Sequence, residues 1–429
     1  MIRICFEMDL KESFLFRNLP VVRHEGKFIV YDYFSGQIAK VSETDLINNT
    51  LPELSFDNTP LPKLPSKDRA TITLILNRDC NMRCGYCFAV GGEFKEVIEE
   101  RHIKAAIDTA VTNDTKELLL TFFGGEPTLC FDRIVYAVAE AEKTRIPTIF
   151  AISTNGVMPR KTLDFLISKE FAFNLSMDGP PDIQDKLRPL VGNRPSSKFV
   201  ENTIERLVES GMSFKVRSTI TAETVHDMPR IVEYLASRGV KYIHFEAVNI
   251  SGRAETEKVT RPEAYDFVEE FKKSCESAKK LGVSIVNGIY TNLINPSIHS
   301  CSATTGGKLI VTPEGKISRC YEVQDSRHPF SDQFIVGRYN SLTNSFELDT
   351  EKAKRLCERS SETSEKCRDC FAKYICGGGC VMRNLHGLHT SDIREVDDYQ
   401  CTIIKGLLND AIVRIWESSI QGEHNDKGS

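Results

Sequence analysis

Three cysteines in one short loop have the clearest capacity for chemistry in this chain. Cys80, Cys84 and Cys87 lie in the stretch DCNMRCGYCFA, at gaps of three and two residues. Thiolates at these gaps can converge on one face of a four-iron, four-sulfur cube. Three protein ligands leave one iron open to a reactant, just as catalytic zinc sites keep one position open. Structural zinc is the alternative, but it usually takes four protein ligands in paired CxxC groups.

A second group of cysteines lies towards the C-terminus. Its seven members are Cys301, Cys320, Cys367, Cys370, Cys376, Cys380 and Cys401. Fourteen cysteines in a reducing compartment do not suit a disulfide framework, and clustering at short gaps indicates metal binding. A zinc ribbon is the alternative for this region taken alone. Cys5, Cys130 and Cys275 stand apart from both groups, and we expect them to serve as small apolar residues.

Charge and apolar runs exclude two classes of partner. The 55 basic and 60 acidic side chains give a formal charge of −5, and no block of like charge stands out. This pattern indicates neither nucleic acid nor a membrane surface as a partner. The opening MIRICFEMDLK carries acidic residues and is not a signal peptide. No run of eighteen apolar residues occurs, so we expect no membrane span and a cytoplasmic location.

The elements that must position these cysteines follow a regular order. Six strand candidates alternate with helix-like segments, at residues 71–77, 117–123, 147–153, 171–177, 214–220 and 240–248. Serial βα units predict an α/β fold in which helices surround a parallel sheet. Six units are too few for an eight-stranded barrel, so we expect an open, partial barrel. Its active residues should lie at the C-terminal ends of the strands.

The sequence divides into five expected parts. They are a small β-rich unit (1–65), the partial barrel (66–260), a helical bridge (261–300), the cysteine-rich domain (301–405) and a C-terminal helix and tail (406–429). In the first part, KFIVYDYFSGQIAKVS alternates apolar and polar residues around Ser35-Gly36, which predicts a β-hairpin. The proline-spaced NTPLPKLPSKD reads as a linker.

The CxxxCxxC loop after a first strand resembles the signature of the radical SAM superfamily. Tyr86, directly before the third cysteine, also suits the family pattern. The resemblance implies that the amino and carboxylate groups of S-adenosylmethionine chelate the open iron. It further implies that one electron cleaves the sulfonium and that the deoxyadenosyl radical abstracts a hydrogen atom from the substrate.

Three more stretches match the family, each directly after a strand: FGGEP, STNG and SMDGP. The cofactor-binding residues implied by the resemblance are Gly124, Gly125, Glu126, Ser153, Asn155, Asp178 and Arg217. Glycines allow close backbone approach, and Glu126 can accept a hydrogen bond from the methionine ammonium. The STNG stretch would contact the ribose or methionine part, and Arg217 would pair with the methionine carboxylate.

The C-terminal cysteines resemble the SPASM extension of radical SAM enzymes, which binds two auxiliary four-iron clusters. The resemblance gives one cluster Cys367, Cys370, Cys376 and Cys401. It gives the other Cys301, Cys320 and Cys380. Fully ligated members have one more cysteine shortly before Cys301, and this chain has none there. The fourth ligand could be Cys357, His299 or no protein group, and an open position would accept a substrate thiolate.

By resemblance, the chain is an enzyme that modifies a ribosomally made precursor peptide. A thioether or another side-chain crosslink is the favoured product, and a flavodoxin or ferredoxin is the implied electron donor. The first alternative is anaerobic sulfatase maturation, which forms formylglycine. That branch has an Asp base where this chain has Tyr321-Glu322, so either residue is a candidate base. The other alternative is a zinc-stabilised binding protein without catalysis.

The N-terminal unit has two interpretations. It could bind a leader peptide by adding it as a strand to a sheet edge, although 65 residues are short for the full recognition domain. It could equally be a structural hairpin that covers the mouth of the barrel.

Overall fold

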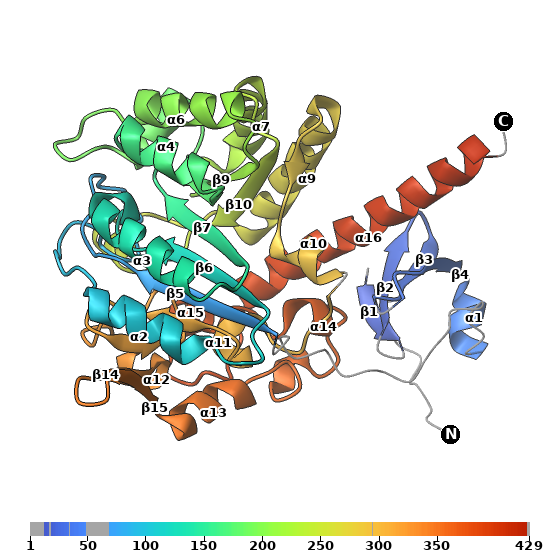
Figure 1. Cartoon of the computed structure of the whole chain (residues 1–429). Helices are drawn as coiled ribbons and strands as arrows, with labels where there is room; N and C mark the ends of the chain where they lie inside the picture. Colours follow the sequence, from blue (N-terminus) through green and yellow to red (C-terminus); the bar gives the residue numbers. More distant parts are fainter. Residues whose placement is uncertain (1–12, 17–18, 34, 49–67, 294, 427–429) are drawn as a thin grey trace.

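The computed structural model describes residues 13–16, 19–33, 35–48, 68–293 and 295–426 (Figure 1). The expected linker between Asn58 and Lys67 and the isolated Cys5 lie outside these residues. No helix in the described part of the chain is both long and apolar enough to cross a bilayer.

Six parallel strands form the centre of the molecule. They are β5 (Arg69–Ile75), β6 (Glu117–Phe123), β7 (Thr148–Thr154), β8 (Ala172–Ser176), β9 (Phe214–Ile220) and β10 (Tyr242–Ala247). They lie side by side in chain order, and each pairs in parallel with the next. The predicted six-unit parallel sheet is therefore confirmed, and each strand end falls within two residues of its expected position.

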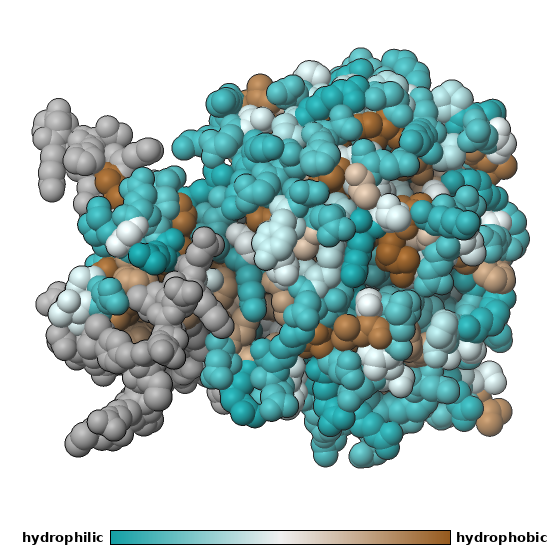
Figure 2. Space-filling model, turned by 180° about the vertical axis from the view of Figure 1, so that it is seen from behind, coloured by the Kyte–Doolittle hydropathy of each residue, from teal (hydrophilic) through white to brown (hydrophobic). Residues whose placement is uncertain are grey.

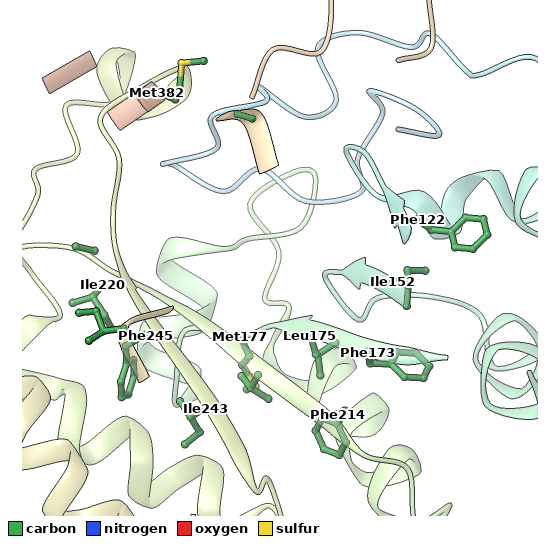
Figure 3. Close-up of a cluster of buried hydrophobic side chains, with 14 of the residues drawn as sticks. Phe122, Ile152, Phe173, Leu175, Met177, Phe214, Ile220, Ile243, Phe245 and Met382 are labelled. Carbon is green, nitrogen blue, oxygen red and sulfur yellow. The ribbon is translucent and has the colours of Figure 1, made fainter. Parts of the chain in front are cut away.

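Helices alternate with these strands and pack on the outside of the sheet (Figure 1). They are α2 (Glu100–Ala110), α3 (Phe131–Lys143), α4 (Arg160–Ser168), α5 (Pro181–Leu187), α6 (Ser197–Glu209) and α7 (Met228–Ser237). Every second strand residue is apolar and points towards them, as Figure 3 shows for Phe173, Leu175, Phe214, Ile243 and Phe245. Because strand side chains alternate, the residues between them face inward.

The sheet continues beyond the six units at both edges. At one edge, β11 (Ser284–Ile285) pairs in parallel with β10. At the other, β12 (Leu309–Val311) pairs in parallel with β5, and β13 (Lys316–Ser318), β14 (Ile335–Asn340) and β15 (Ser345–Leu348) follow in antiparallel order. The cysteine-rich region is thus hydrogen-bonded to the first barrel strand, an arrangement that no local pattern predicts.

The remaining helices belong mainly to the bridge and the C-terminal region. They are α8 (Arg253–Thr256), α9 (Ala264–Leu281), α10 (Gly288–Leu293), α11 (Ser302–Thr305), α12 (Ser331–Phe334), α13 (Thr350–Glu358), α14 (Lys373–Cys376), α15 (Val381–Leu388) and α16 (Asp398–Asp426). The helix α16 packs against α9. It begins at Asp398 and runs to Asp426, so the expected boundary at residue 406 falls inside it.

The N-terminal unit is a four-stranded antiparallel sheet followed by a short helix. Its elements are β1 (Ser13–Phe16), β2 (Leu19–His24), β3 (Lys27–Tyr31), β4 (Ile38–Val41) and α1 (Glu43–Asn48). The predicted hairpin is confirmed, because Tyr31 pairs with Ile38 across the turn at Gly36. The strands β2, β3 and β4 contact α16 (Figure 1). The Tyr33 ring also contacts the Tyr374 ring. The unit therefore rests on the C-terminal region and not over the strand ends of the barrel.

The back of the molecule is mainly hydrophilic, with smaller apolar areas between the polar ones (Figure 2). Most of the residues that the sequence assigns to the cofactor site lie instead in the loop after β5 and at the C-terminal ends of β6, β7 and β8.

Candidate active site

The glycines after β6 fit against the cysteine loop. The Gly125 N–H donates to the Asn77 carbonyl (3.0 Å), and the Glu126 N–H donates to the Asp79 carbonyl (2.7 Å). A Cβ at Gly125 would lie 2.1 Å from the Asp79 oxygen, and one at Gly124 would lie 2.6 Å from the Asn77 oxygen. The φ of Gly124 is +152°, which also favours glycine. These two positions require glycine because the backbone that leads into Cys80 occupies the space of a side chain.

The loop after β10 clamps the cysteine loop from another side. The Arg253 guanidinium donates to the carbonyls of Cys84 (3.0 Å) and Gly91 (3.1 Å). Its backbone N–H donates to the carbonyl of Cys87 (3.0 Å). The sequence reasoning did not find Arg253, because nothing near it in the chain indicates that it reaches back 169 residues to Cys84.

Glu126 is fully buried and holds the two loops beside Cys80 together. One carboxylate oxygen accepts hydrogen bonds from Thr128 and from the Thr154 hydroxyl (2.7 Å), and the other accepts from the Asn155 N–H (2.7 Å). Burial raises the pKa of Glu126, and these hydrogen bonds oppose that rise. The second oxygen accepts a single bond here, so it can also accept one from an ammonium group.

Asn155 extends this arrangement to the first cysteine. Its side-chain N–H₂ donates to Asn81 (2.7 Å) and lies 3.6 Å from the Cys80 sulfur. Ser153 is on the inner face of β7, where it pairs in register with Asn174 of β8. Both residues therefore lie on the side of the sheet on which sequence reasoning placed the cofactor.

Asp178 connects the cysteine loop to a buried arginine. It accepts hydrogen bonds from the Tyr86 hydroxyl and the Thr219 N–H, and it lies 3.0 Å from Arg188 Nε. The Arg188 guanidinium stacks on the Tyr86 ring at 5.2 Å. Burial raises the pKa of the Cys84 thiol, and the charge of Arg188 opposes part of that rise. These contacts occupy Asp178 with protein groups and hold the Arg188 guanidinium beside Tyr86 in the cysteine loop.

Arg188 was missed by sequence reasoning, which chose Arg217. Arg217 lies on β9 with its guanidinium 3.9 Å from Glu246. The available signal was the LRP stretch ten residues after Asp178, but only the fold shows that α5 returns Arg188 to Tyr86.

The cysteine thiols need a metal in order to ionise. Burial raises the pKa of Cys80 and raises that of Cys84 to about 11, so neither is a thiolate at neutral pH by itself. Coordination to a metal removes the proton outright. Four thiolates around one zinc ion lie about 3.8 Å apart, given a Zn–S bond of about 2.3 Å.

Among the described residues, no three cysteines bring their sulfurs within 4.8 Å of one another. In this part of the chain, no three cysteine sulfurs are therefore arranged around a single zinc ion. The one set of three metal-binding side chains within that distance in this part of the chain is Glu322, His328 and His386.

The C-terminal cysteines gather into two sets. In one set, burial raises the pKa of Cys320, and the nearby charges of Cys380 and Cys301 raise it further. In the other, burial and the charges of Cys401, Cys367 and Cys370 raise the pKa of Cys376 to about 12. These are the two sets named by the resemblance. Cys357 instead lies beside Gly306 and Arg319, with its sulfur 3.4 Å from the position of a Cβ on Gly306.

A buried arginine lies between the two sets. The Arg359 side chain donates to the carbonyls of Gly377 (3.1 Å), Gly379 (3.0 Å) and Ile393 (3.1 Å), and Gly378 accepts a further bond. Arg359 is 1% exposed, and this burial lowers the pKa of its guanidinium. Cysteines of both sets lie close enough to oppose that decrease. The Gly377-Gly378-Gly379 loop turns around this guanidinium with positive φ at all three glycines.

Tyr321 and Glu322 lie at the C-terminal ends of the barrel strands. The Tyr321 ring packs on Phe123, the last residue of β6, with centroids 5.2 Å apart. Glu322 pairs with His386 Nε2 at 2.9 Å and lies 3.4 Å from the side-chain amide of Asn249, just beyond β10. Burial alone would raise the pKa of Glu322, but His386 and other donors lower it. A carboxylate thus borders the space where the sequence placed the reaction.

The comparisons agree with this geometry. The family model of the radical SAM superfamily matches residues 74–235. A cysteine-type anaerobic sulfatase-maturating enzyme of Clostridium perfringens (strain 13 / Type A) is 21% identical over 366 residues, which are 78% of this chain and 94% of the relative.

Two solved structures share the fold. Native anSMEcpe with bound AdoMet and the Cp18Cys peptide matches with a TM-score of 0.64 and 18% identity, over 82% of this chain and 99% of that one. Streptococcus suis SuiB bound to precursor peptide SuiA matches with a TM-score of 0.55 and 15% identity, over 90% of this chain and 99% of that one.

The fold and the site define an enzyme built on a partial βα barrel with a cysteine-rich extension. Residues 74–235 carry the radical SAM domain, and the chain as a whole shares its fold with anSMEcpe and SuiB. The cofactors of this family are a four-iron, four-sulfur cluster and S-adenosylmethionine. The zinc-stabilised, non-catalytic alternative is therefore wrong.

Proposed function

We propose that this enzyme modifies a side chain of a ribosomally made peptide, in a reaction that begins with hydrogen-atom abstraction. The observation that carries the proposal is the position of Tyr321 and Glu322, which the C-terminal extension presents at the strand ends beside the cysteine loop. When bound, the cluster and S-adenosylmethionine supply a deoxyadenosyl radical for the abstraction.

In this proposal Cys80, Cys84 and Cys87 hold the catalytic cluster. Gly125 and Glu126 position the cysteine loop and receive the methionine ammonium. Arg188 is the group that we assign to the methionine carboxylate, because it stacks on Tyr86 and is near Cys84. Arg217, the candidate predicted from the sequence, lies 3.9 Å from Glu246 and is not assigned to the cofactor.

We assign Cys367, Cys370, Cys376 and Cys401 to one auxiliary cluster and Cys301, Cys320 and Cys380 to the other. Cys301 is solvent-exposed, whereas Cys320 and Cys380 are partly buried, so the second set of three thiols is accessible from the side of Cys301. A substrate thiolate could complete that set, which favours thioether formation within the wider class of side-chain crosslinks. Cys357 has no place in this assignment, because its charged neighbour is Arg319.

Likeness to a peptide-bound structure supports the peptide as substrate. Residues 69–429 make up about 84% of this chain, whereas the match to SuiB covers 90% of it. The match must therefore include residues of the N-terminal unit. SuiB was solved with its precursor peptide. The proposed location is the cytoplasm, where reducing conditions keep cysteine thiols available for metal binding. The proposed electron donor is a flavodoxin or a ferredoxin.

Sulfatase maturation is the second candidate, because the sulfatase-maturating relative matches 78% of the chain. Glu322, held by His386, would then accept the proton.

One experiment separates the two functions. The anaerobically reconstituted enzyme is given S-adenosylmethionine, a reductant and either a precursor peptide encoded beside the gene or a cysteine-containing sulfatase peptide, and the products are analysed by mass spectrometry. A crosslink removes two hydrogens and keeps all sulfur, whereas formylglycine formation replaces the cysteine sulfur with oxygen. Deoxyadenosine release without modification of either peptide would refute both candidates.

A further inference from the structure

The inner face of β9 and β10 carries charged side chains. Phe214 and Ile220 of β9 and Ile243 and Phe245 of β10 belong to the apolar cluster packed against the helices (Figure 3). Their neighbours therefore face the opposite way, into the barrel. On β9 these are Lys215, Arg217 and Thr219, and on β10 they are Tyr242, His244 and Glu246. Lys215 pairs in register with Tyr242, and Arg217 pairs with His244.

Arg217 is accessible to solvent on this inner face. Half of its side-chain surface is exposed, yet burial lowers the pKa of the guanidinium. The exposed surface and the lowered pKa are compatible, because protein atoms can surround the Arg217 side chain without touching it while solvent still reaches it. Burial likewise lowers the pKa of Lys215, and the positive charge of Arg217 lowers it further.

Positive charge exceeds negative charge on this face. The carboxylate of Glu246 already pairs with Arg383 at 2.7 Å and with His244 at 3.1 Å, while Arg217 is 3.9 Å away. Within the described residues, the Lys215 ammonium has neither an ion pair nor a hydrogen bond. Lys215 and Arg217 lie on the same face of one strand, so their positive charges repel each other. An anion bound between them would offset this electrostatic repulsion.

The methionine carboxylate of the cofactor is not this anion. Arg188, its assigned partner, lies 3.5 Å from the Thr219 hydroxyl at the C-terminal part of β9. Lys215 is four residues earlier, which is roughly 13 Å along a strand. Lys215 therefore needs a second anion, other than the methionine carboxylate, to balance its charge.

We propose that Lys215 and Arg217 bind a carboxylate of the substrate, either an aspartate or glutamate side chain or the chain terminus. The inference rests on the proposed peptide substrate, whose side chain reacts at the strand ends. Three residues of extended peptide span about 10 Å, so the carboxylate belongs to a residue about three or four positions from the reacting one. The barrel then selects peptides with an acidic residue at that separation.

Saturation-transfer NMR with two capped tripeptides tests the carboxylate site directly. One peptide carries a central glutamate and the other a central glutamine, and both are titrated into the reconstituted enzyme with S-adenosylmethionine. We expect the wild type to bind the glutamate peptide at least about fivefold more tightly. Lys215→Met should abolish that preference, and Lys215→Arg should keep it because the charge remains.

Lys241→Met is the matched control, because Lys241 is exposed and precedes the inward-facing Tyr242 on the same edge. It should leave the preference intact. Equal binding of the two peptides to the wild type, or an unchanged preference in Lys215→Met with normal iron content and melting temperature, would overturn the proposal.

The modification assay with the precursor peptide separates this outcome from failure of the proposed function. If no peptide is modified but the glutamate preference exists and needs Lys215, the carboxylate site stands and the peptide reaction fails. If the peptide is modified without any glutamate preference, the site fails and the reaction stands.

Discussion

The contact between Gly125 and the cysteine loop allows a quantitative prediction. In Gly125→Ala, the new Cβ would lie 2.1 Å from the Asp79 oxygen, whereas ordinary contact begins at 3.4 Å. The atom it meets is backbone, so the loop must move by about 1 Å. Such overpacking costs about 1–3 kcal/mol. Loss of the hydrogen bond from the Glu126 N–H to Asp79 adds about 1 kcal/mol.

Together these effects disfavour the native loop by about 2–4 kcal/mol, or roughly 30- to 700-fold in its population. The three thiols then no longer converge, and we expect the catalytic cluster to be lost. Iron content after anaerobic reconstitution should fall from about twelve to about eight per chain, since each cube holds four irons. Release of deoxyadenosine should disappear with it.

Gly85→Ala provides the matched control inside the CxxxCxxC motif. A Cβ there would meet only Val259, at 3.9 Å, and this φ is not in the region reserved for glycine. This variant should keep its iron and its cleavage of S-adenosylmethionine, although Gly85 lies between two cluster cysteines. If Gly125→Ala and Gly85→Ala load iron and cleave S-adenosylmethionine equally well, the close approach of β6 to the loop has no functional role.

Three further changes have defined outcomes. Cys320→Ala should lower iron content by up to about four atoms per chain, whereas Cys357→Ala should match the wild type; equal losses would place Cys357 among the ligands. Tyr86→Phe removes a hydrogen bond from Asp178, so that carboxylate pairs more strongly with Arg188 and competes with the methionine carboxylate. The affinity for S-adenosylmethionine should therefore fall about fivefold by equilibrium dialysis, with iron content unchanged. His328 has its pKa lowered by burial from 6.5 to about 4, so the unfolded chain takes up a proton first as the pH falls. Stability should therefore decrease by about 1 kcal/mol between pH 7.5 and pH 5.5, and anaerobic melting curves of His328→Gln should lack this part of the decrease.

Much of the fold could be predicted because its signals are local. Strands buried on both faces read as apolar runs, and the amphipathic segments between them read as helices. The positions of β6 and β9 follow from such runs without error. The start of α16 was misplaced because the segment from Asp398 to Lys405 has no strong apolar period, and its burial depends on contacts with other elements.

The site was predicted less completely. Glu126 and Asn155 could be named because they belong to short motifs, and the structure places both beside Cys80. Arg188, Arg253 and Arg359 could not, because an arginine in a helix or loop has the same sequence signal whether it is solvated or buried. Their roles depend on acceptors that lie 10 to 169 residues away.

The sequence by itself determined the chemistry of this protein, since the type and spacing of Cys80, Cys84 and Cys87 are covalent facts of one short segment. It also determined the order of the βα units, because the periodicity of apolar residues is local. Only the tertiary structure decided which cations serve the cysteine loop and which remain for a substrate. Burial, hydrogen bonding and charge balance arise when segments distant in the chain meet, and the excess charge at Lys215 and Arg217 exists only because β9 and β10 turn those side chains to the same face.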